Sequence, residues 1–299
     1  MRSSTPKPKP PGSQAKPATP PPTLSGAEPP AKAAWDDSTQ ALARNTLVAG
    51  GQQLGLSLSD AQIDALMAYL GLLHKWSKVY NLTAVRDPLE MVTLHLLDSL
   101  AVIPALLRHL ATPHNATERA ALAGHSTSTP PSPSPSPSPA PASASLAAAS
   151  AGKPAQAQPI RLLDVGSGAG LPGVVIAITC PHIQVTCIDA VSKKSAFVQQ
   201  VAASLGLAHL RGLHQRIEQL DAPHDLVCSR AFASLADFVQ GSTNALAPGG
   251  VWLALKGKTP TEEMSALGPD VDVFHVEQLQ VPGLDAQRCL VWMRSAAIP

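Results

Sequence analysis

The stretch Ile160–Gly173 constrains the fold of this chain more than any other. It reads Ile-Arg-Leu-Leu-Asp-Val-Gly-Ser-Gly-Ala-Gly-Leu-Pro-Gly, an apolar run that ends in an acid and is followed by alternating glycines. The order predicts a strand over Ile160–Val165, a glycine loop, and a helix that begins near Pro172. Glycines let backbone N–H groups approach a ligand, and a helix N-terminus favours negative charge. A plain strand–turn–helix connection needs only one glycine, so three glycines predict a binding site.

After the glycine loop, apolar runs alternate with helical patterns. Helices are predicted to begin near Ser192 and Ser234, and the second one to run to Leu246 and end at Pro248-Gly249-Gly250. The alternation predicts a parallel sheet with helices on both faces, and the last two strands, joined without a helix, predict an antiparallel hairpin. The further strands are predicted at Gln184–Asp189, His209–His214, Asp225–Ser229, Val251–Lys256, Val271–Val281 and Arg288–Arg294.

Residues 35–112 are predicted to form an N-terminal helical segment. Ser59 followed three residues later by Gln62 is a capping box, and an apolar helical spacing follows it. The run Asp87-Pro88-Leu89-Glu90 is a second helix start, with an Asp cap and proline in the first turn. Pro104 is expected to kink or end that helix.

Two proline-rich stretches flank the helical segment. Of the 30 prolines in the 299-residue chain, ten fall in residues 1–34 and ten in residues 113–159. We predict a disordered Pro/Lys-rich tail over 1–34 and a disordered, dispensable Ser/Pro/Ala insert over 113–159. The remaining segment, residues 160–299, is predicted to be a ligand-binding α/β domain.

Composition narrows the environment in which the chain works. The net charge is +1, so binding to RNA would need a local basic patch. The four cysteines form no C-x-x-C pair, which indicates free thiols in a reducing cytosol. No apolar stretch was expected to reach the ~18 residues that span a membrane. These features predict a soluble, cytoplasmic protein.

The spacing within the glycine loop separates two classes of nucleotide ligand. Gly166, Gly168 and Gly170 form G-x-G-x-G, and Leu171 stands where the third glycine of the dinucleotide fingerprint G-x-G-x-x-G would be. With Asp164 two residues before the first glycine, the pattern resembles motif I of class I S-adenosylmethionine (SAM) methyltransferases. A nicotinamide-binding oxidoreductase is disfavoured by Leu171 and by the C-terminal hairpin.

Further blocks make the resemblance specific. They are Trp76–Ala84 (W-S-K-V-Y-N-L-T-A), His95–Ser99 (H-L-L-D-S), Leu163–Gly173, Ser229–Leu235 (S-R-A-F-A-S-L), Leu255–Gly257 and Gln280–Asp285. Together they resemble the RsmG/GidB family over roughly residues 42–110 and 159–294. That family methylates N7 of guanine 527 in 16S ribosomal RNA. The resemblance implies a class I methyltransferase fold, Rossmann-like, with a seven-stranded, mostly parallel sheet and a C-terminal antiparallel hairpin.

The resemblance also assigns a SAM site. The loop Gly166, Gly168 and Gly170 would take the methionine end, Asp164 would meet its ammonium group directly or through water, and Leu171 would pack on the cofactor. Asp189, at the end of the second predicted strand, would bind the ribose hydroxyls, although a helix cap would also explain it. Ile217 and Glu218 would hold the adenine, and Glu218 would equally fit a solvated helix.

Guanine N7 carries a bare lone pair, so its methylation needs no general base. Catalysis is therefore expected to come from proximity and orientation, which can supply roughly 7–11 kcal/mol. Arg230 follows the fourth predicted strand, where class I enzymes line the target-base pocket and the cofactor, and it is the predicted catalytic residue. A surface salt bridge is the alternative for Arg230. Phe232 is expected either to stack on the base or to pack in the core.

Lys193, Lys194 and Lys256 are the predicted contacts to RNA phosphates, because all three lie at carboxyl ends of strands. The stripe His95, Asp98 and Ser99 is interpreted as a hydrogen-bond network that docks its helix beside the SAM loop. Trp76 and Tyr80 are interpreted as packing residues, with RNA stacking as the alternative. No metal is predicted, because the ten histidines show no ligand spacing.

The predicted function is SAM-dependent methylation of 16S rRNA, with rRNA or the small ribosomal subunit as partner and a monomeric enzyme. Two alternatives stay open on the sequence: a class I methyltransferase that acts on another RNA or a small substrate, and a non-catalytic ribosome-binding module. The N-terminal blocks favour the rRNA enzyme over the first alternative. The intact glycine loop and Asp189 favour it over the second.

Overall fold

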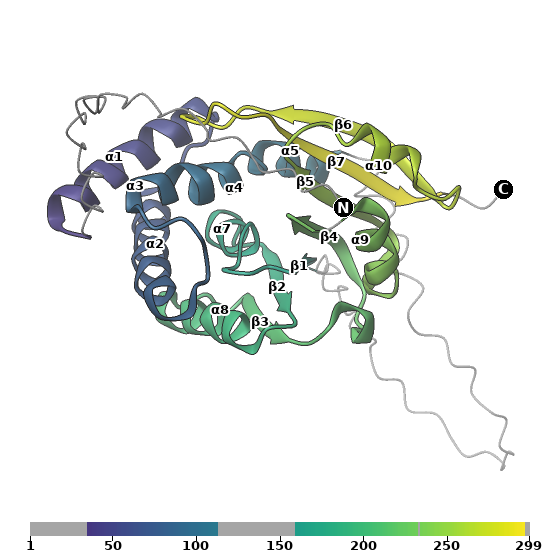
Figure 1. Ribbon diagram of the computed structural model, residues 1–299, viewed down its shortest axis with the longest axis horizontal. Helices are drawn as coiled ribbons and strands as arrows, with labels where there is room; N and C mark the ends of the chain where they lie inside the picture. The colour runs from purple at the N-terminus through teal and green to yellow at the C-terminus, as the bar shows by residue number, and fades with distance from the viewer. Residues whose placement is uncertain (1–34, 113–158, 233, 297–299) are drawn as a thin grey trace, which may run out of the picture. The chain divides into compact units, whose positions relative to one another are not determined.

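The computed structural model describes residues 35–112, 159–232 and 234–296. A seven-stranded sheet with the order β3-β2-β1-β4-β5-β7-β6 forms its centre (Figure 1). β1 to β5 pair in parallel, whereas β7 runs antiparallel to both β5 and β6. This is the predicted class I methyltransferase sheet, with a reversed strand inserted next to β5. The predicted tail and most of the insert, residues 1–34 and 113–158, lie outside the described residues.

The strands agree closely with the predicted positions. β1 begins and ends as predicted, and the others shift by a few residues at their ends. The strands are β1 (Ile160–Val165), β2 (Ile183–Asp189), β3 (Leu210–His214), β4 (His224–Arg230), β5 (Leu246–Lys256), β6 (Val271–Leu279) and β7 (Arg288–Ser295). The helices that alternate with them are α7 (Gly173–Thr179), α8 (Ser192–Leu205), η2 (Ile217–Gln219), α9 (Leu235–Ser242), η3 (Thr243–Ala245) and α10 (Thr261–Ser265).

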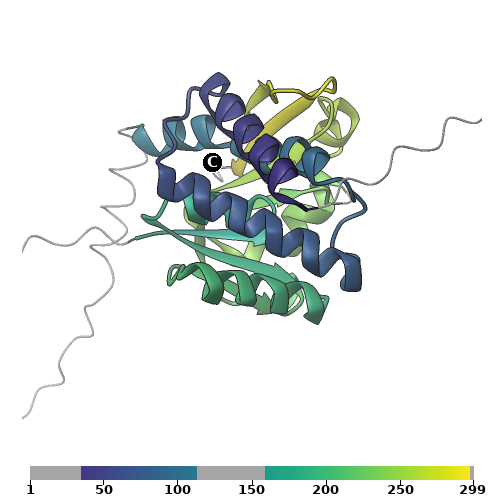
Figure 2. The same cartoon turned by 90° about the vertical axis from the view of Figure 1, so that its left-hand side faces the viewer.

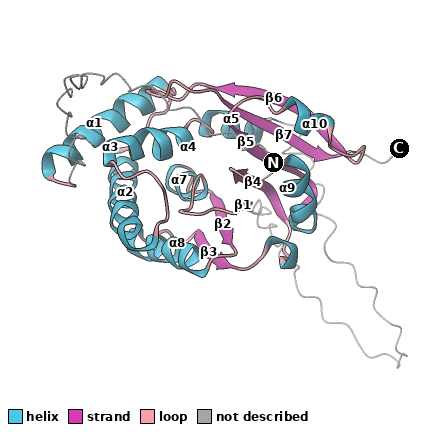
Figure 3. Cartoon of the chain, viewed as in Figure 1, coloured by secondary structure: helices cyan, strands magenta, loops and turns pink. Residues whose placement is uncertain are grey.

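Two apolar cores lie on the two faces of the sheet. One joins the N-terminal helices, α7 and α8 to the sheet through side chains such as Leu162 and Val185. The other joins α9 and α10 to the opposite face through side chains such as Leu163 and Val227. Figure 3 shows the resulting layers, with helices on both sides of the strands. Neighbouring residues of one strand therefore face different cores, as expected for a sheet buried on both faces.

The end of α9 and the start of β5 differ from the predicted pattern. The helix ends at Ser242 and is followed by the 3₁₀ turn η3, while β5 already begins at Leu246 and contains Pro248-Gly249-Gly250. Ser242, the last residue of α9, is fixed by its hydroxyl, which donates to the Phe238 carbonyl and accepts the indole N–H of Trp252 at 2.9 Å. A Cβ at Gly250 would lie 3.0 Å from the Asp225 carbonyl oxygen, so this glycine lets β5 approach β4. The short α10 was not predicted.

The N-terminal segment is helical, as predicted. It consists of α1 (Asp37–Gln53), α2 (Asp60–Tyr80), α3 (Pro88–Met91), the π-helix η1 (Val92–Leu97), α4 (Asp98–Leu100) and α5 (Ile103–Ala111). The capping box of Ser59 and Gln62 is confirmed at the start of α2, and Asp87 caps α3 through the amides of Leu89 and Glu90. Figure 2 shows α2 lying between α1 and α8.

The run Pro88–Ala111 confirms one expectation and corrects another. The helix ends before Pro104, since α4 stops at Leu100, and Pro104 lies in the first turn of α5, where its missing N–H costs nothing. The run is also long and apolar enough to pass as a membrane span by length and composition, although no such stretch was expected. Because most of this run is buried inside the structure, its apolar side chains fill the core.

Two side chains of α2 hold α7 and the loop before it. The hydroxyl of Tyr69, which is fully buried, donates a 2.8 Å hydrogen bond to the carbonyl of Ala169 in the glycine loop. Gln62 donates to the carbonyls of Ile178 and Thr179 at the other end of α7. The N-terminal segment therefore fixes the loop that the sheet presents.

We expect Tyr69→Phe to lower the free energy of unfolding by about 1–3 kcal/mol, because it leaves the buried Ala169 carbonyl without its donor. Urea titration measures the change. Tyr80→Phe is the matched control, since Tyr80 is 41% exposed. Equal stability of the two variants would contradict a structural role for the Tyr69 hydroxyl.

Candidate functional site

The glycine loop links β1 to α7 through residues that turn in the left-handed region. Gly166, Gly168 and Gly170 have φ values of 64°, 58° and 85°, which residues other than glycine rarely adopt. A Cβ at Gly170 would lie 2.4 Å from a methyl group of Val174, so this position is also closed by packing. The spacing of the three glycines is thus required by the conformation of the backbone.

Asp164 lies at the end of β1 beneath the loop and is fully buried. Its Oδ2 accepts a 2.8 Å hydrogen bond from the amide of Gly173 at the start of α7. Burial raises the pKa of Asp164 to about 7, although the Gly173 hydrogen bond and the Arg230 charge oppose the rise. Asp164 therefore joins the loop to the helix, and its contact with an ammonium group, directly or through water, stays a prediction.

Leu171 lies largely in the core. Only 4% of the residue is exposed, and it packs in the core shared with the N-terminal helices, so its contact with the cofactor stays a prediction. Leu171 is buried because the loop turns it inward just before α7 begins. Its side chain anchors the loop from below.

Asp189 ends β2 beside the loop. Its Oδ2 accepts a 3.0 Å hydrogen bond from the Gly168 amide, and its Oδ1 accepts a 2.8 Å bond from the Val191 amide. Lys194 lies 3.5 Å from the same Oδ2. Asp189 therefore connects the glycine loop to the start of α8, at the position where the ribose acid was predicted. Asp189 is not the helix cap, because Val191 is the N-cap residue of α8 and no side chain caps that helix; the ribose contact stays a prediction.

Ile217 and Glu218 form the start of η2, after β3. Ile217 is buried in the core that also contains Leu163 and Ile188, whereas Glu218 is exposed. The predicted adenine contact of these two residues stays a prediction.

Arg230, at the end of β4, is held by a residue of the N-terminal segment. Its Nη1 donates to Asp98 Oδ2 at 2.9 Å and to the Leu94 carbonyl at 3.1 Å. Arg288, the first residue of β7, donates from Nε to the other oxygen of Asp98 at 2.7 Å. One buried carboxylate thus orients two guanidinium groups, whose side chains are 21% and 26% exposed. A guanidinium has five N–H donors, so both arginines retain donors for a ligand.

The stripe His95, Asp98 and Ser99 docks its helix as predicted, through two of its three members. His95 Nε2 shares a 2.7 Å hydrogen bond with Thr83 Oγ1, and Asp98 binds the arginines. Burial, reinforced by the Arg230 charge, lowers the pKa of His95 to about 4, so its ring is neutral near pH 7. The hydroxyl of Ser99 is buried without a hydrogen-bond partner among the described residues.

The segment after Arg230 is turned sharply. Ala231 has a φ of 63°, which is unusual for a residue with a side chain and is typical of functional turns. The ring of Phe232 lies against the glycine loop, 3.7 Å from where a Cβ of Gly166 would be, and 5.8 Å from the ring of Phe238. Phe232 therefore lies partly exposed beside the loop and also contacts the core, so both predicted roles remain compatible with its position.

The three lysines predicted to bind phosphate all have partners within the chain. Lys193 lies over the ring of Tyr80 at 5.5 Å, and Lys194 faces Asp189. The side chain of Lys256 is only 13% exposed and binds Glu263 at 2.7 Å, which counts against a phosphate contact from this position. The contacts of Lys193 and Lys194 to RNA stay predictions.

The cysteines are unpaired, as predicted. Cys180, Cys187, Cys228 and Cys289 are all buried, and burial raises the pKa of each thiol. Protonated, buried thiols are poor nucleophiles. Within residues 35–112, 159–232 and 234–296, no group of three or more His, Cys, Asp or Glu side chains is arranged to hold a metal ion.

Sequence reasoning missed Arg288 and Tyr69 as parts of the site. Arg288 opens an apolar strand, and its proximity to Asp98 depends on β7 inserting next to β5. Tyr69 lies on an apolar helix face. A buried tyrosine hydroxyl needs a hydrogen-bond partner, and this need could have identified Tyr69 from the sequence.

Solved structures with related folds resemble parts of the chain. TrmN from Thermus thermophilus is 20% identical, with a TM-score of 0.39 over 46% of this chain and 44% of that one. A SAM-dependent methyltransferase from Geobacter sulfurreducens in complex with S-adenosyl-L-homocysteine is 14% identical, with a TM-score of 0.36 over 46% and 85% of the two chains.

Sequence relatives are much closer. The family model GidB, described as rRNA small subunit methyltransferase G, matches residues 62–111 and 144–291. Proteins named ribosomal RNA small subunit methyltransferase G are 52% identical in a Polaromonas species, over 83% of this chain and 92% of the relative, and 50% identical in Leptothrix cholodnii, over 85% and 97%. The chain therefore belongs to the GidB family of rRNA small subunit methyltransferases G.

Proposed function

We propose that this chain is the SAM-dependent enzyme that methylates N7 of guanine 527 in 16S ribosomal RNA. The observation that carries the proposal is the joint placement of the glycine loop and Arg230 by one N-terminal segment, through Tyr69 and Asp98. Relatives with the rRNA methyltransferase name are about half identical over most of their length. The proposed partner is the RNA of the small ribosomal subunit in the cytoplasm, and the monomeric state stays a prediction.

The residues at the carboxyl edge of β1 and β2 fit SAM. The left-handed glycines leave the backbone of the loop open to the methionine end of the ligand, and the Asp189 carboxylate lies beside them to accept ribose hydroxyls. Asp164 Oδ1 is buried without a nitrogen or oxygen donor among the described residues, which leaves it an acceptor under the loop. Ile217 and Glu218 complete the adenine side of the proposed site.

SAM supplies a methyl group on a positively charged sulfur. The protein's part is to bring guanine N7 into line with that methyl group, and it needs no base because N7 has no proton to lose. Arg230 is placed to donate to guanine O6 or to a neighbouring phosphate with the donors that Asp98 leaves free. Phe232 is placed beside the loop to stack on the base. Neutral His95 and the protonated thiols are consistent with a mechanism without proton transfer.

The decisive test maps N7-methylguanine in 16S rRNA from a strain that lacks this gene. We expect the modification at position 527 to disappear and to return when the gene is supplied on a plasmid. Mass mapping of rRNA digests measures it. N7-methylguanine that persists at this position in the deletion strain would refute the proposed substrate.

We expect Gly168→Asp to abolish SAM binding. The substitution strains a backbone at φ 58° and places a second carboxylate beside Asp189, whose Oδ2 bonds the Gly168 amide. Gly206→Asp is the matched control, because Gly206 ends α8 at φ 64° with no neighbour within 4 Å of its Cβ position. Isothermal titration calorimetry compares the two variants. Unchanged SAM affinity in Gly168→Asp would place the cofactor elsewhere.

Asp98→Asn tests the positioning of Arg230. The loss of the charge that orients both guanidinium groups weakens charge-assisted hydrogen bonds of about 1.5–3 kcal/mol, so we expect kcat for rRNA methylation to fall roughly 10- to 100-fold with SAM affinity retained. Asp272→Asn removes the partner of exposed Arg294 and serves as control. If both variants keep wild-type kcat, Asp98 has no part in positioning.

A further inference from the structure

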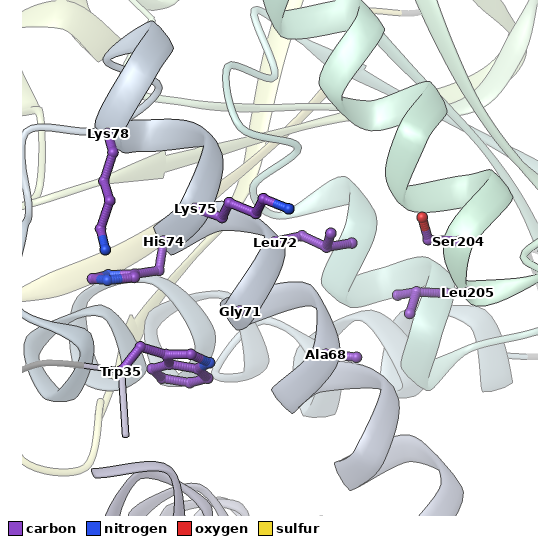
Figure 4. Close-up of a pocket in the computed structure, with 9 residues that line it drawn as sticks. All are labelled: Trp35, Ala68, Gly71, Leu72, His74, Lys75, Lys78, Ser204 and Leu205. Carbon is purple, nitrogen blue, oxygen red and sulfur yellow. The ribbon is translucent and has the colours of Figure 1, made fainter. Parts of the chain in front are cut away.

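A pocket of about 550 Å³ lies where α2 meets Trp35 and the end of α8 (Figure 4). Its volume lies within the ~300–1,000 Å³ that small-ligand sites occupy. Ser204 and Leu205, which line it, end the 14-residue helix α8, about 21 Å along the helix from the end that meets Asp189. The pocket is lined by Trp35, Ala68, Gly71, Leu72, His74, Lys75, Lys78, Ser204 and Leu205.

One wall of the pocket is a stack of two rings. The indole of Trp35 and the imidazole of His74 lie 5.9 Å apart, with 27° between their planes. Gly71 admits the indole, because a Cβ there would lie 3.3 Å from Trp35 Nε1. Figure 4 shows the His74 ring projecting from α2 toward Trp35. Trp35 also packs against the core that joins the N-terminal helices to the sheet, which holds this flat π surface in place.

His74 adds an unsatisfied polar atom to this wall. The residue is 7% exposed, yet its Nε2 is buried without a hydrogen-bond partner among the described residues. A buried polar atom without a partner is unfavourable, so it points to a ligand that supplies one. Burial, with a contribution from Lys78, lowers the pKa of His74 and keeps the ring neutral. The nearby acid Asp87 is already engaged by the amides that it caps.

The charge of the pocket is positive. Lys75 and Lys78 are exposed, and neither has an ion-pair partner in the part of the chain that the structure describes. They contrast with Lys193, Lys194 and Lys256, each of which is held by a side chain of the protein. In Figure 4, Lys75 projects from α2 toward α8. Free lysines next to stacked rings are the combination that binds phosphate and base together.

We propose that this pocket binds an unpaired nucleotide of the RNA substrate, at a distance from the nucleotide that is methylated. The base lies against the Trp35–His74 stack with an edge toward His74 Nε2, and Lys75 and Lys78 contact the adjoining phosphates. The proposal rests on the proposed function, since it makes the pocket a second anchor for the same RNA. Its role is affinity and register, because none of its lining residues belongs to the glycine loop.

The test uses the full chain and deproteinised 16S rRNA, with filter binding and methylation kinetics. We expect the double variant Lys75→Ala/Lys78→Ala to raise Kd and KM for rRNA about tenfold, with kcat and the Kd for SAM unchanged. The slope of log K against log salt should fall by about 1.4, the value for two phosphates of a single strand. Trp35→Ala should weaken binding several-fold, and Trp35→Phe should retain most of it.

Arg211→Ala is the control for loss of an exposed cation. Arg211 and Gly212 are neighbours on β3, and Gly212 faces α8. Because successive residues of a strand point to opposite faces, the Arg211 side chain projects to the face away from α8. Unchanged rRNA affinity and salt slope in the lysine variant would overturn the proposal. An effect seen only with assembled subunits would overturn it as well and would assign the pocket to a protein partner. Failure of the wild-type chain to methylate rRNA would refute the proposed function, whereas filter binding still tests the pocket.

Discussion

The hydrogen bond from the Gly173 amide to the buried Asp164 carboxylate is the contact on which the site depends. It ties the end of β1 to the first turn of α7 at 2.8 Å. Gly173 cannot be replaced by a residue with a side chain without a clash, since a Cβ there would lie 2.5 Å from Cys187 Sγ. With both ends fixed so closely, the chain between them must turn through left-handed conformations, and only glycines do this without strain. The raised pKa of Asp164 is the electrostatic cost of the arrangement.

The N-terminal segment makes a substrate-specific site out of this general loop. Tyr69 and Gln62 bond the glycine loop and the end of α7. Asp98 binds Arg230 and Arg288 at the carboxyl edge of the sheet. Because these contacts join one helical segment to β4, β7 and the loop, a shift of the helices would move the cofactor side and the target side together. For a reaction that depends on alignment rather than proton transfer, that coupling is the main catalytic requirement.

Sequence patterns predicted the features that depend on local geometry. The glycine spacing, the capping box at Ser59 and the alternation of strands and helices follow from the backbone needs of a few neighbouring residues. The features that the patterns did not reveal are decided by distant packing. Leu171 lies in the core shared with the N-terminal helices, and Asp164 is fully buried and bonds the Gly173 amide of α7. Similarly, the partner of Lys256 comes from α10, a helix that the sequence pattern did not reveal.

The distribution of charge explains how a protein with a net charge of +1 can recognise RNA. At the carboxyl edge of the sheet, cations are held by carboxylates, as Arg230 and Arg288 are by Asp98 and Lys194 is by Asp189. Such pairing fixes the geometry but reduces the attraction for phosphate. Long-range attraction must therefore come from lysines without such partners, and Lys75 and Lys78 on α2 meet that condition. Alignment at the loop and affinity along α2 are thus carried by different residues, which allows tight RNA binding without disturbing the geometry of methyl transfer.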